Sequence, residues 1–143
     1  MTQIEIAARA DDELYEAFQS LVPQMTQNNP PPTREDLAAL INDPSSTLLL
    51  ARAENGSIIG ALNLTVYRVP TGVRSIIEDV IVDISARGQG IGEALMNRAV
   101  LIAREKGAQK IALSSNPMRV AANNLYVKLG FKKRETNAYL LML

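Results

Sequence analysis

The residues best suited to chemistry start with a short glycine-rich segment, residues 87–92. A hydrophobic run, residues 76–84, precedes it and an amphipathic run, residues 93–106, follows it, so the pattern predicts a strand, a turn and a helix. Glycines permit unusual backbone angles. The first amides of a helix have no partner within the helix and lie at the positive end of its dipole. We therefore expect this turn to bind an anion, most readily a phosphate group.

The spacing of the glycines separates the classes of phosphate ligand. A nucleoside-triphosphate loop needs Lys and Ser or Thr directly after its last glycine, and the dinucleotide motif needs Gly-x-Gly-x-x-Gly. Neither pattern is present. The pattern that does fit is Gln/Arg-x-x-Gly-x-Gly/Ala, formed by Arg87, Gly90 and Gly92. Taken alone, these glycines are also compatible with a flexible turn that binds nothing.

A second segment, residues 119–131, adds to the first motif. It reads Arg-x-x-Ala-Asn-x-Leu-Tyr-x-x-x-Gly-Phe. Together the two segments resemble the GNAT superfamily of acyl-CoA N-acyltransferases, in which a pyrophosphate-binding loop precedes a helix with alanine, asparagine and tyrosine. The resemblance covers residues 76–143, and the first half of the chain is similar only in the order of its predicted elements.

The resemblance implies that acetyl-CoA is the cosubstrate. Its diphosphate would lie on the glycine loop, and its pantetheine arm would pair with the preceding strand, while the parallel strand of residues 111–114 splays away. A backbone amide near Val80 would then stabilise the developing oxyanion. The cofactor-binding residues so implied are Val80, Ile81, Val82, Arg87, Gly88, Gln89, Gly90, Ile91 and Gly92.

The resemblance also assigns roles on the second motif. Tyr126 matches the tyrosine that protonates the leaving thiolate, and the alternative is an aromatic residue packed in the core. Asn123 lies about one helical turn earlier and therefore on the same face. It resembles the asparagine that contacts the CoA arm, and Asn116 is a weaker candidate for the same region.

Glu78 is the candidate general base. It lies two residues before Val80, so in a regular strand the two side chains share a sheet face, and Asp79 points the other way. Glu78 resembles the glutamate that takes the amine proton, directly or through water, in several members of the superfamily. The alternative is an exposed acid that only attracts a cationic substrate.

The composition excludes several mechanisms. The chain has 143 residues, enough for one domain, residues 1–143, with its own core. It contains neither Cys nor His, so a thiolate route, a Ser-His-Asp triad and the usual zinc sites are ruled out. We expect no metal site. Acid and base chemistry is left to carboxylates, tyrosine, lysine, backbone groups or water.

Charge and hydrophobicity indicate the compartment and the partners. Residues 1–83 carry a net charge of −7 and residues 84–143 a net charge of +7, which suits a cationic amine and an anionic cofactor respectively. No apolar run is long enough to span a membrane, and the first residues lack the basic end and the apolar stretch that are typical of a signal peptide. We expect a cytoplasmic protein that uses neither nucleic acid nor membrane as its partner.

The elements that must position these residues follow from hydrophobic periodicity and turn residues. With the fold that the resemblance implies, they give an α/β domain with a mixed, mostly antiparallel seven-stranded sheet, one parallel strand pair and about four helices. Ile4 and Ile6 are expected to face inward. The predicted strands are residues 3–8, 47–53, 58–69, 73–83, 110–114, 131–134 and 137–143, and the predicted helices begin near residues 11, 33, 93 and 120.

The predicted function is transfer of an acetyl group from acetyl-CoA to a primary amine, by direct attack in a ternary complex. The acceptor is not identified by the sequence. An alternative is a non-catalytic acyl-CoA-binding sensor or interaction module, which would need neither Tyr126 nor Glu78. A homodimer is a further expectation, because the apolar tail of residues 139–143 reads as an edge strand that needs covering.

Overall fold

The fold is built on one mixed sheet. The computed structural model describes residues 2–143, and its five strands lie in the order β1-β2-β3-β4-β5. The first three pairings are antiparallel, and β4 and β5 form the predicted parallel pair. The strands are β1 (Gln3–Ile6), β2 (Ser46–Arg52), β3 (Ile58–Val69), β4 (Gly72–Val82) and β5 (Ile111–Ala112).

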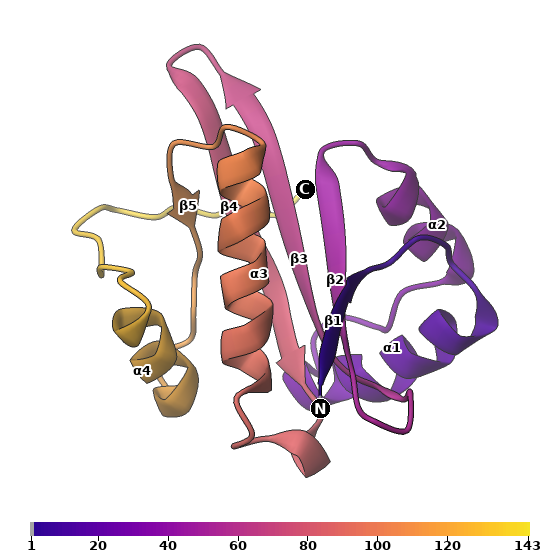
Figure 1. Ribbon diagram of the computed structural model, residues 1–143. Helices are drawn as coiled ribbons and strands as arrows, with labels where there is room; N and C mark the ends of the chain where they lie inside the picture. Colours follow the sequence, from indigo (N-terminus) through magenta and orange to yellow (C-terminus); the bar gives the residue numbers. More distant parts are fainter. Residues whose placement is uncertain (1) are drawn as a thin grey trace.

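Within residues 2–143, three α-helices and one short 3₁₀ turn connect these strands, and a fourth α-helix follows the last strand. Figure 1 shows α1 and α2 on one side of the sheet and α3 on the other, with α4 beside β5. Within residues 2–143, no helix is both long and apolar enough to cross a bilayer. The elements are α1 (Asp12–Met25), α2 (Arg34–Asn42), η1 (Ile84–Ala86), α3 (Ile91–Glu105) and α4 (Val120–Lys128).

The first two helices begin at the predicted capping residues. The Asp11 side chain accepts a hydrogen bond from the Leu14 amide at 2.9 Å. Thr33 and Asp36 form a reciprocal capping box before α2. Such side chains satisfy amides that the helix itself leaves unpaired. Helix α1 continues past Pro23 to Met25, and this extra turn brings its end to the pocket described below.

Leucines on both faces of β2 and β3 divide the core into two clusters. Leu62, Leu64 and Ile77 pack with α3, whereas Leu50 and Ile81 pack with α1 and α2. Because alternate residues of a strand point to opposite faces, a run of consecutive aliphatic residues buries both sides. The central strands are thereby fixed between two helical layers.

The predicted seven-stranded sheet is wrong in its last two strands. Residues 132–143 contain no strand, and the five side chains from Tyr139 to Leu143 are all at least 80% exposed. The expected hairpin has no Gly or Asn-Gly pair at its turn, and its tail is uniformly apolar instead of alternating. The sequence therefore supplies neither a defined register nor a preferred face.

One expectation about the first strand is also wrong. Ile4 packs against the cluster beneath α3, but Ile6 is 49% exposed. Strand β1 lies at the edge of the sheet and ends at Ile6. The end of an edge strand has fewer neighbours to cover it, so alternation alone did not predict the burial of Ile6.

Gly60 gives a test of the packing between β3 and α3. A Cβ atom there would lie 3.0 Å from the Ile81 carbonyl oxygen and 3.3 Å from atoms of Ile91 and Leu95. We predict that Gly60→Val lowers the free energy of unfolding by about 1–3 kcal/mol, measured by urea denaturation. Arg68→Val, at an exposed position of the same strand, is the control. Equal stability of the two variants would contradict this packing account.

Candidate functional site

The site forms where β4 and β5 separate. Their pairing consists of Ser75 with Ile111 and Ile76 with Ala112, after which β5 ends. The Ser75 hydroxyl donates to the Lys110 carbonyl oxygen at 2.8 Å, which fixes the pair just before it opens. Strand β4 continues to Val82. The rest of its outer edge therefore has no strand partner, as the expected splaying of the parallel strand requires.

A β-bulge lies at the centre of this open edge. Asn63 pairs with Glu78 and Ala61 pairs with Ile81, so Leu62 faces two residues of β4. Asp79 occupies the left-handed region with a φ of 54°. Asp tolerates this conformation better than most residues. The extra residue twists the strand and reverses the alternation of its side chains beyond this point.

The prediction that Glu78 and Val80 share a sheet face is wrong because of this bulge. Ile77 packs with α3 whereas Ile81 packs with α1, although residues four apart lie on one face in a regular strand. Glu78 is exposed and does not line the pocket that contains Val80. The role of Glu78 as a base stays a prediction.

The glycine loop and the start of α3 form one wall of this pocket. Gly88 and Gly90 have φ values of 77° and 79°, a conformation that favours glycine. The amides of residues 88–93 donate no hydrogen bond to another described residue. Ile91 is 2% exposed and packs beneath the helix. The buried Ile91 side chain thus fixes the loop while its amides stay available.

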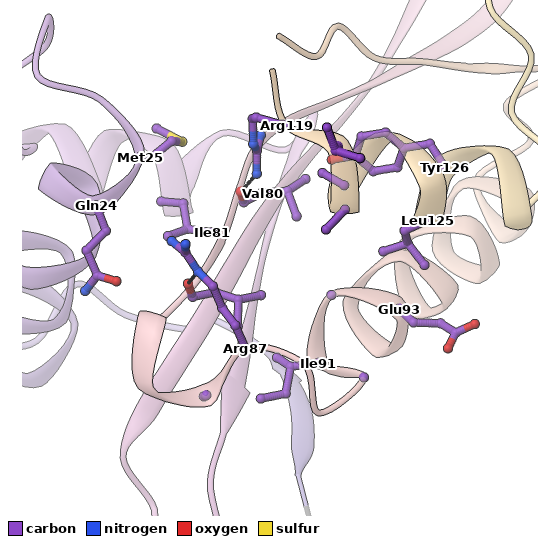
Figure 2. A pocket seen from close by; sticks show the side chains of 18 residues that line it. Gln24, Met25, Val80, Ile81, Arg87, Ile91, Glu93, Arg119, Leu125 and Tyr126 are labelled. Atoms are coloured by element: carbon purple, nitrogen blue, oxygen red, sulfur yellow. Dashed lines mark hydrogen bonds between the residues drawn. The ribbon is translucent and has the colours of Figure 1, made fainter. Parts of the chain in front are cut away.

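Arg87 and Gln89 differ in their relation to the pocket. The Nε of Arg87 donates to the Val82 carbonyl oxygen at 3.1 Å, and Arg87 lines the pocket together with Gly88, Gly90, Ile91 and Gly92. Gln89 is exposed and does not line it. Figure 2 shows the Arg87 side chain beside Ile81, at the end of β4. The structure therefore brings together five of the six predicted loop residues.

Helix α4 provides the opposite wall. Tyr126 is 6% exposed and forms an edge-to-face contact with Phe131, with ring centroids 6.1 Å apart. Burial raises the pKa of the Tyr126 phenol, and the positive charge of Arg119 opposes this shift. In Figure 2 Tyr126 and Arg119 lie on the α4 side, across the pocket from Gln24 of α1. Tyr126 is thus both a core residue and a pocket residue.

The two predicted asparagines do not line the pocket. The Asn123 amide donates to the Asn116 carbonyl oxygen at 3.1 Å, and the Asn116 side chain accepts from the Met118 amide at 2.9 Å. These bonds hold the loop against the first turn of α4. They orient the helix that carries Tyr126, and direct contact of either asparagine with CoA stays a prediction.

Sequence reasoning missed the contribution of α1. Gln24 and Met25 line the pocket, and the Gln24 side chain accepts a hydrogen bond from the Ile84 amide at 2.8 Å. Gln24 also donates to Asp83, whose pKa is lowered by hydrogen bonds from Ser85 and then Gln24. The partners are about sixty residues apart, and no local motif indicates such a contact.

Two further charged residues, Glu93 and Arg119, belong to the pocket wall. Glu93 pairs with Lys128 at 2.9 Å and links the first turn of α3 to α4. Arg119 donates to the Val80 carbonyl oxygen at 3.3 Å. With these residues the pocket encloses about 590 Å³ between the end of β4, the glycine loop, α3, α4 and the end of α1.

Comparison with known proteins agrees with this geometry. The model of the Acetyltransferase (GNAT) family matches residues 12–131 of the chain. The chain belongs to this family. The resemblance expected from the glycine loop and from the segment around Tyr126 is thus confirmed.

The curated relatives are similar over part of their length. A glucosamine 6-phosphate N-acetyltransferase of Trypanosoma brucei brucei is 36% identical over 92 residues, which cover 62% of this chain and 60% of that protein. A glucosamine 6-phosphate N-acetyltransferase of Oryza sativa subsp. japonica is 38% identical over 58 residues, or 41% of this chain and 33% of that protein. The chain thus spans less than two thirds of these relatives.

Solved structures are similar over the whole chain. An acetyltransferase of Trypanosoma brucei superposes with a TM-score of 0.79 at 26% identity and covers 99% of this chain and 100% of its own. An aminoglycoside acetyltransferase from an uncultured soil metagenomic sample has a TM-score of 0.80 at 22% identity, covering 99% and 95% respectively. The second similarity concerns the fold alone.

The buried phenol predicts an unusual titration. Because burial raises the pKa of Tyr126, we expect its phenol to ionise above pH ~10, the ordinary value for tyrosine. The measurement is the phenolate absorbance of the wild type minus that of Tyr126→Phe as the pH is raised. A difference transition at or below the ordinary tyrosine range would contradict the burial of this hydroxyl.

Proposed function

We propose that this chain transfers an acetyl group from acetyl-CoA to a primary amine. The observation that supports it most strongly is the coincidence of three features in one pocket. These are a β4 edge without a further strand partner and a loop whose amides have no partner, both among residues 2–143, and the Tyr126 phenol. Family membership supports the same class of reaction.

The residues present fit acetyl-CoA. The free amides of residues 88–93 lie at a helix N-terminus, a preferred position for a diphosphate. The edge of β4 offers backbone donors and acceptors to an arm that contains two amide groups, in the manner of an added strand. Acetyl-CoA supplies the activated thioester, and the chain supplies its binding and orientation.

The chain's own groups then have separate tasks. The backbone amide of Val80, beside the bulge, is suited to donate to the carbonyl oxygen as negative charge develops there. The Tyr126 hydroxyl holds the proton that the departing sulfur requires. The proton of the attacking amine passes to Glu78 or to water, and the exposed position of Glu78 makes water an equal alternative.

The names of the relatives suggest an acceptor class. Two of them are glucosamine 6-phosphate N-acetyltransferases, so an amino sugar phosphate is the first acceptor to test. The excess of carboxylates in residues 1–83 favours an acceptor with a cationic amine. Free-thiol release from acetyl-CoA in the presence of amino sugars, polyamines, amino acids and peptides would identify the class.

Replacement of Tyr126 separates catalysis from binding. We predict that Tyr126→Phe lowers kcat by about 10²-fold or more, because a positioned general acid contributes this much. The Kd for CoA should change by less than about threefold, which corresponds to less than about 0.7 kcal/mol. Turnover is measured by thiol release and affinity by calorimetry. Tyr67→Phe, a tyrosine that does not line the pocket, is the control.

One outcome would favour the rival function, and another would change only the role of Tyr126. If the wild type binds CoA but releases no thiol with any amine of the panel, a non-catalytic acyl-CoA sensor becomes the better account. If Tyr126→Phe retains full turnover, the chain is still an acetyltransferase, but Tyr126 is not its general acid.

We also infer that the chain forms a homodimer through its tail. Five consecutive apolar side chains, from Tyr139 to Leu143, are each at least 80% exposed, and apolar patches of this kind usually mark an interaction surface. We predict that truncation after Asn137 shifts the sedimenting species from dimer to monomer. A monomeric full-length chain at micromolar concentration would contradict this assembly.

A further inference from the structure

Arg119 has a position that the proposed function does not explain. It directly precedes α4 and lines the pocket. Its Nη2 donates to the carbonyl oxygen of Val80 at 3.3 Å, on the edge of β4 that β5 leaves open. Figure 2 shows this contact as the link between α4 and the strand. The guanidinium is therefore held at the bulge, next to the backbone amide suited to the oxyanion.

The same guanidinium belongs to a residue that lines the pocket together with Tyr126. Arg119 is the residue before the first turn of α4, and Tyr126 lies in that helix. The charge of Arg119 lowers the pKa of Tyr126 in opposition to burial, which is the effect of a nearby cation on a phenol. Strand β4, Arg119 and Tyr126 thus converge on one part of the cavity.

The positive charge of Arg119 is not neutralised by a described carboxylate. Some other cations of residues 2–143 have carboxylate partners: Arg52 pairs with Glu5 and Glu13, and Lys128 pairs with Glu93. Arg119 forms no ion pair with any residue of that range. Its contact with the Val80 carbonyl uses one donor of a group that has five. The remaining donors are available to a negative charge on a ligand.

We propose that Arg119 is a catalytic residue whose guanidinium stabilises the negative charge on the departing sulfur while the Tyr126 hydroxyl delivers its proton. This proposal rests on the proposed acetyl transfer. Preorganised cations and donors stabilise charge that develops in a transition state, and Arg119, although exposed, is held at the pocket wall by its contact with Val80. The guanidinium stays protonated throughout, so its contribution is electrostatic and no proton moves to or from it.

The step balances without a further reactant. The amine lone pair forms the new C–N bond, and as the C–S bond breaks its electron pair passes to sulfur. Sulfur takes the Tyr126 proton and becomes the free thiol. The proton released by the amine passes to Glu78 or to water and from there to solvent, and solvent reprotonates the phenolate. The products are one amide and one thiol.

The test compares Arg119→Met with Arg119→Lys in the full chain. We expect Arg119→Met to lower kcat about 10²-fold, the size of effect found when one charge-stabilising donor is removed. The KM for acetyl-CoA should change little, and Arg119→Lys should recover a large part of the loss because it keeps the charge. Arg98→Met is the matched control, since Arg98 is exposed on α3 and does not line the pocket.

A second readout is independent of turnover. In Arg119→Met the Tyr126 titration should move to higher pH relative to the wild type, and in Arg119→Lys it should stay closer to the wild-type position. A purely structural role, through the contact with Val80, would not predict recovery by lysine or a shift of that transition. Circular dichroism and urea denaturation show whether each variant remains folded.

Three results would overturn the proposal. The first is an unchanged kcat in Arg119→Met. The second is a raised KM for acetyl-CoA with no fall in kcat. The third is a Tyr126 titration that occurs at the same pH in Arg119→Met as in the wild type. If both the wild type and Arg119→Met show normal turnover, the role of Arg119 is wrong and the proposed acetyl transfer is still supported. Failure of the proposed function is recognised by a wild type that releases no thiol with any amine, and the catalytic proposal then falls with it.

Discussion

The site depends on one unpaired strand edge. Backbone amides and carbonyls within a protein need hydrogen-bond partners, yet β5 pairs with only two residues of β4 before the strands separate. Two arginine side chains partly replace the missing strand, because Arg119 bonds the Val80 carbonyl and Arg87 bonds the Val82 carbonyl. The molecule thus keeps a strand edge that is available to a ligand without exposing a long flat edge to another chain.

This edge is held rigid by the two cores around it. Ile77 anchors β4 beneath α3 before the bulge, and Ile81 anchors it against α1 beyond the bulge. The change of face takes place at Asp79, whose left-handed backbone is of the kind often found at functional sites. On the other side of the pocket, the buried Ile91 side chain fixes the start of α3. The loop amides are therefore positioned before any ligand arrives.

The sequence predicted the parts of the site that are encoded locally. Asp11 and Thr33 start their helices as expected, and Gly90 gives the αL turn before α3. Tyr126 was placed by its motif, and it does line the pocket. These features depend on capping, on φ preferences and on helical spacing, which act over a few residues. They can therefore be recognised without knowledge of tertiary contacts.

The parts that were missed depend on distant contacts. A single extra residue at Asp79 reversed the faces of β4, so the argument that placed Glu78 beside Val80 failed. Nothing near residue 79 in the sequence marks a bulge, because its partner Leu62 lies on another strand. The role of Gln24 likewise depends on a contact with Ile84, sixty residues away. The tail was predicted as a strand from its composition, but composition does not define a partner.

The central claim is that the free amides of residues 88–93 hold the diphosphate while the open edge of β4 holds the amide-bearing arm. Amide hydrogen exchange, measured by NMR with and without CoA, tests it most directly. The account predicts slowed exchange at the loop amides and at Val80 and Val82 with CoA. Pantetheine, which lacks the diphosphate, should slow exchange at the strand alone. Unchanged exchange at the loop with saturating CoA, or protection centred elsewhere in the chain, would contradict the account.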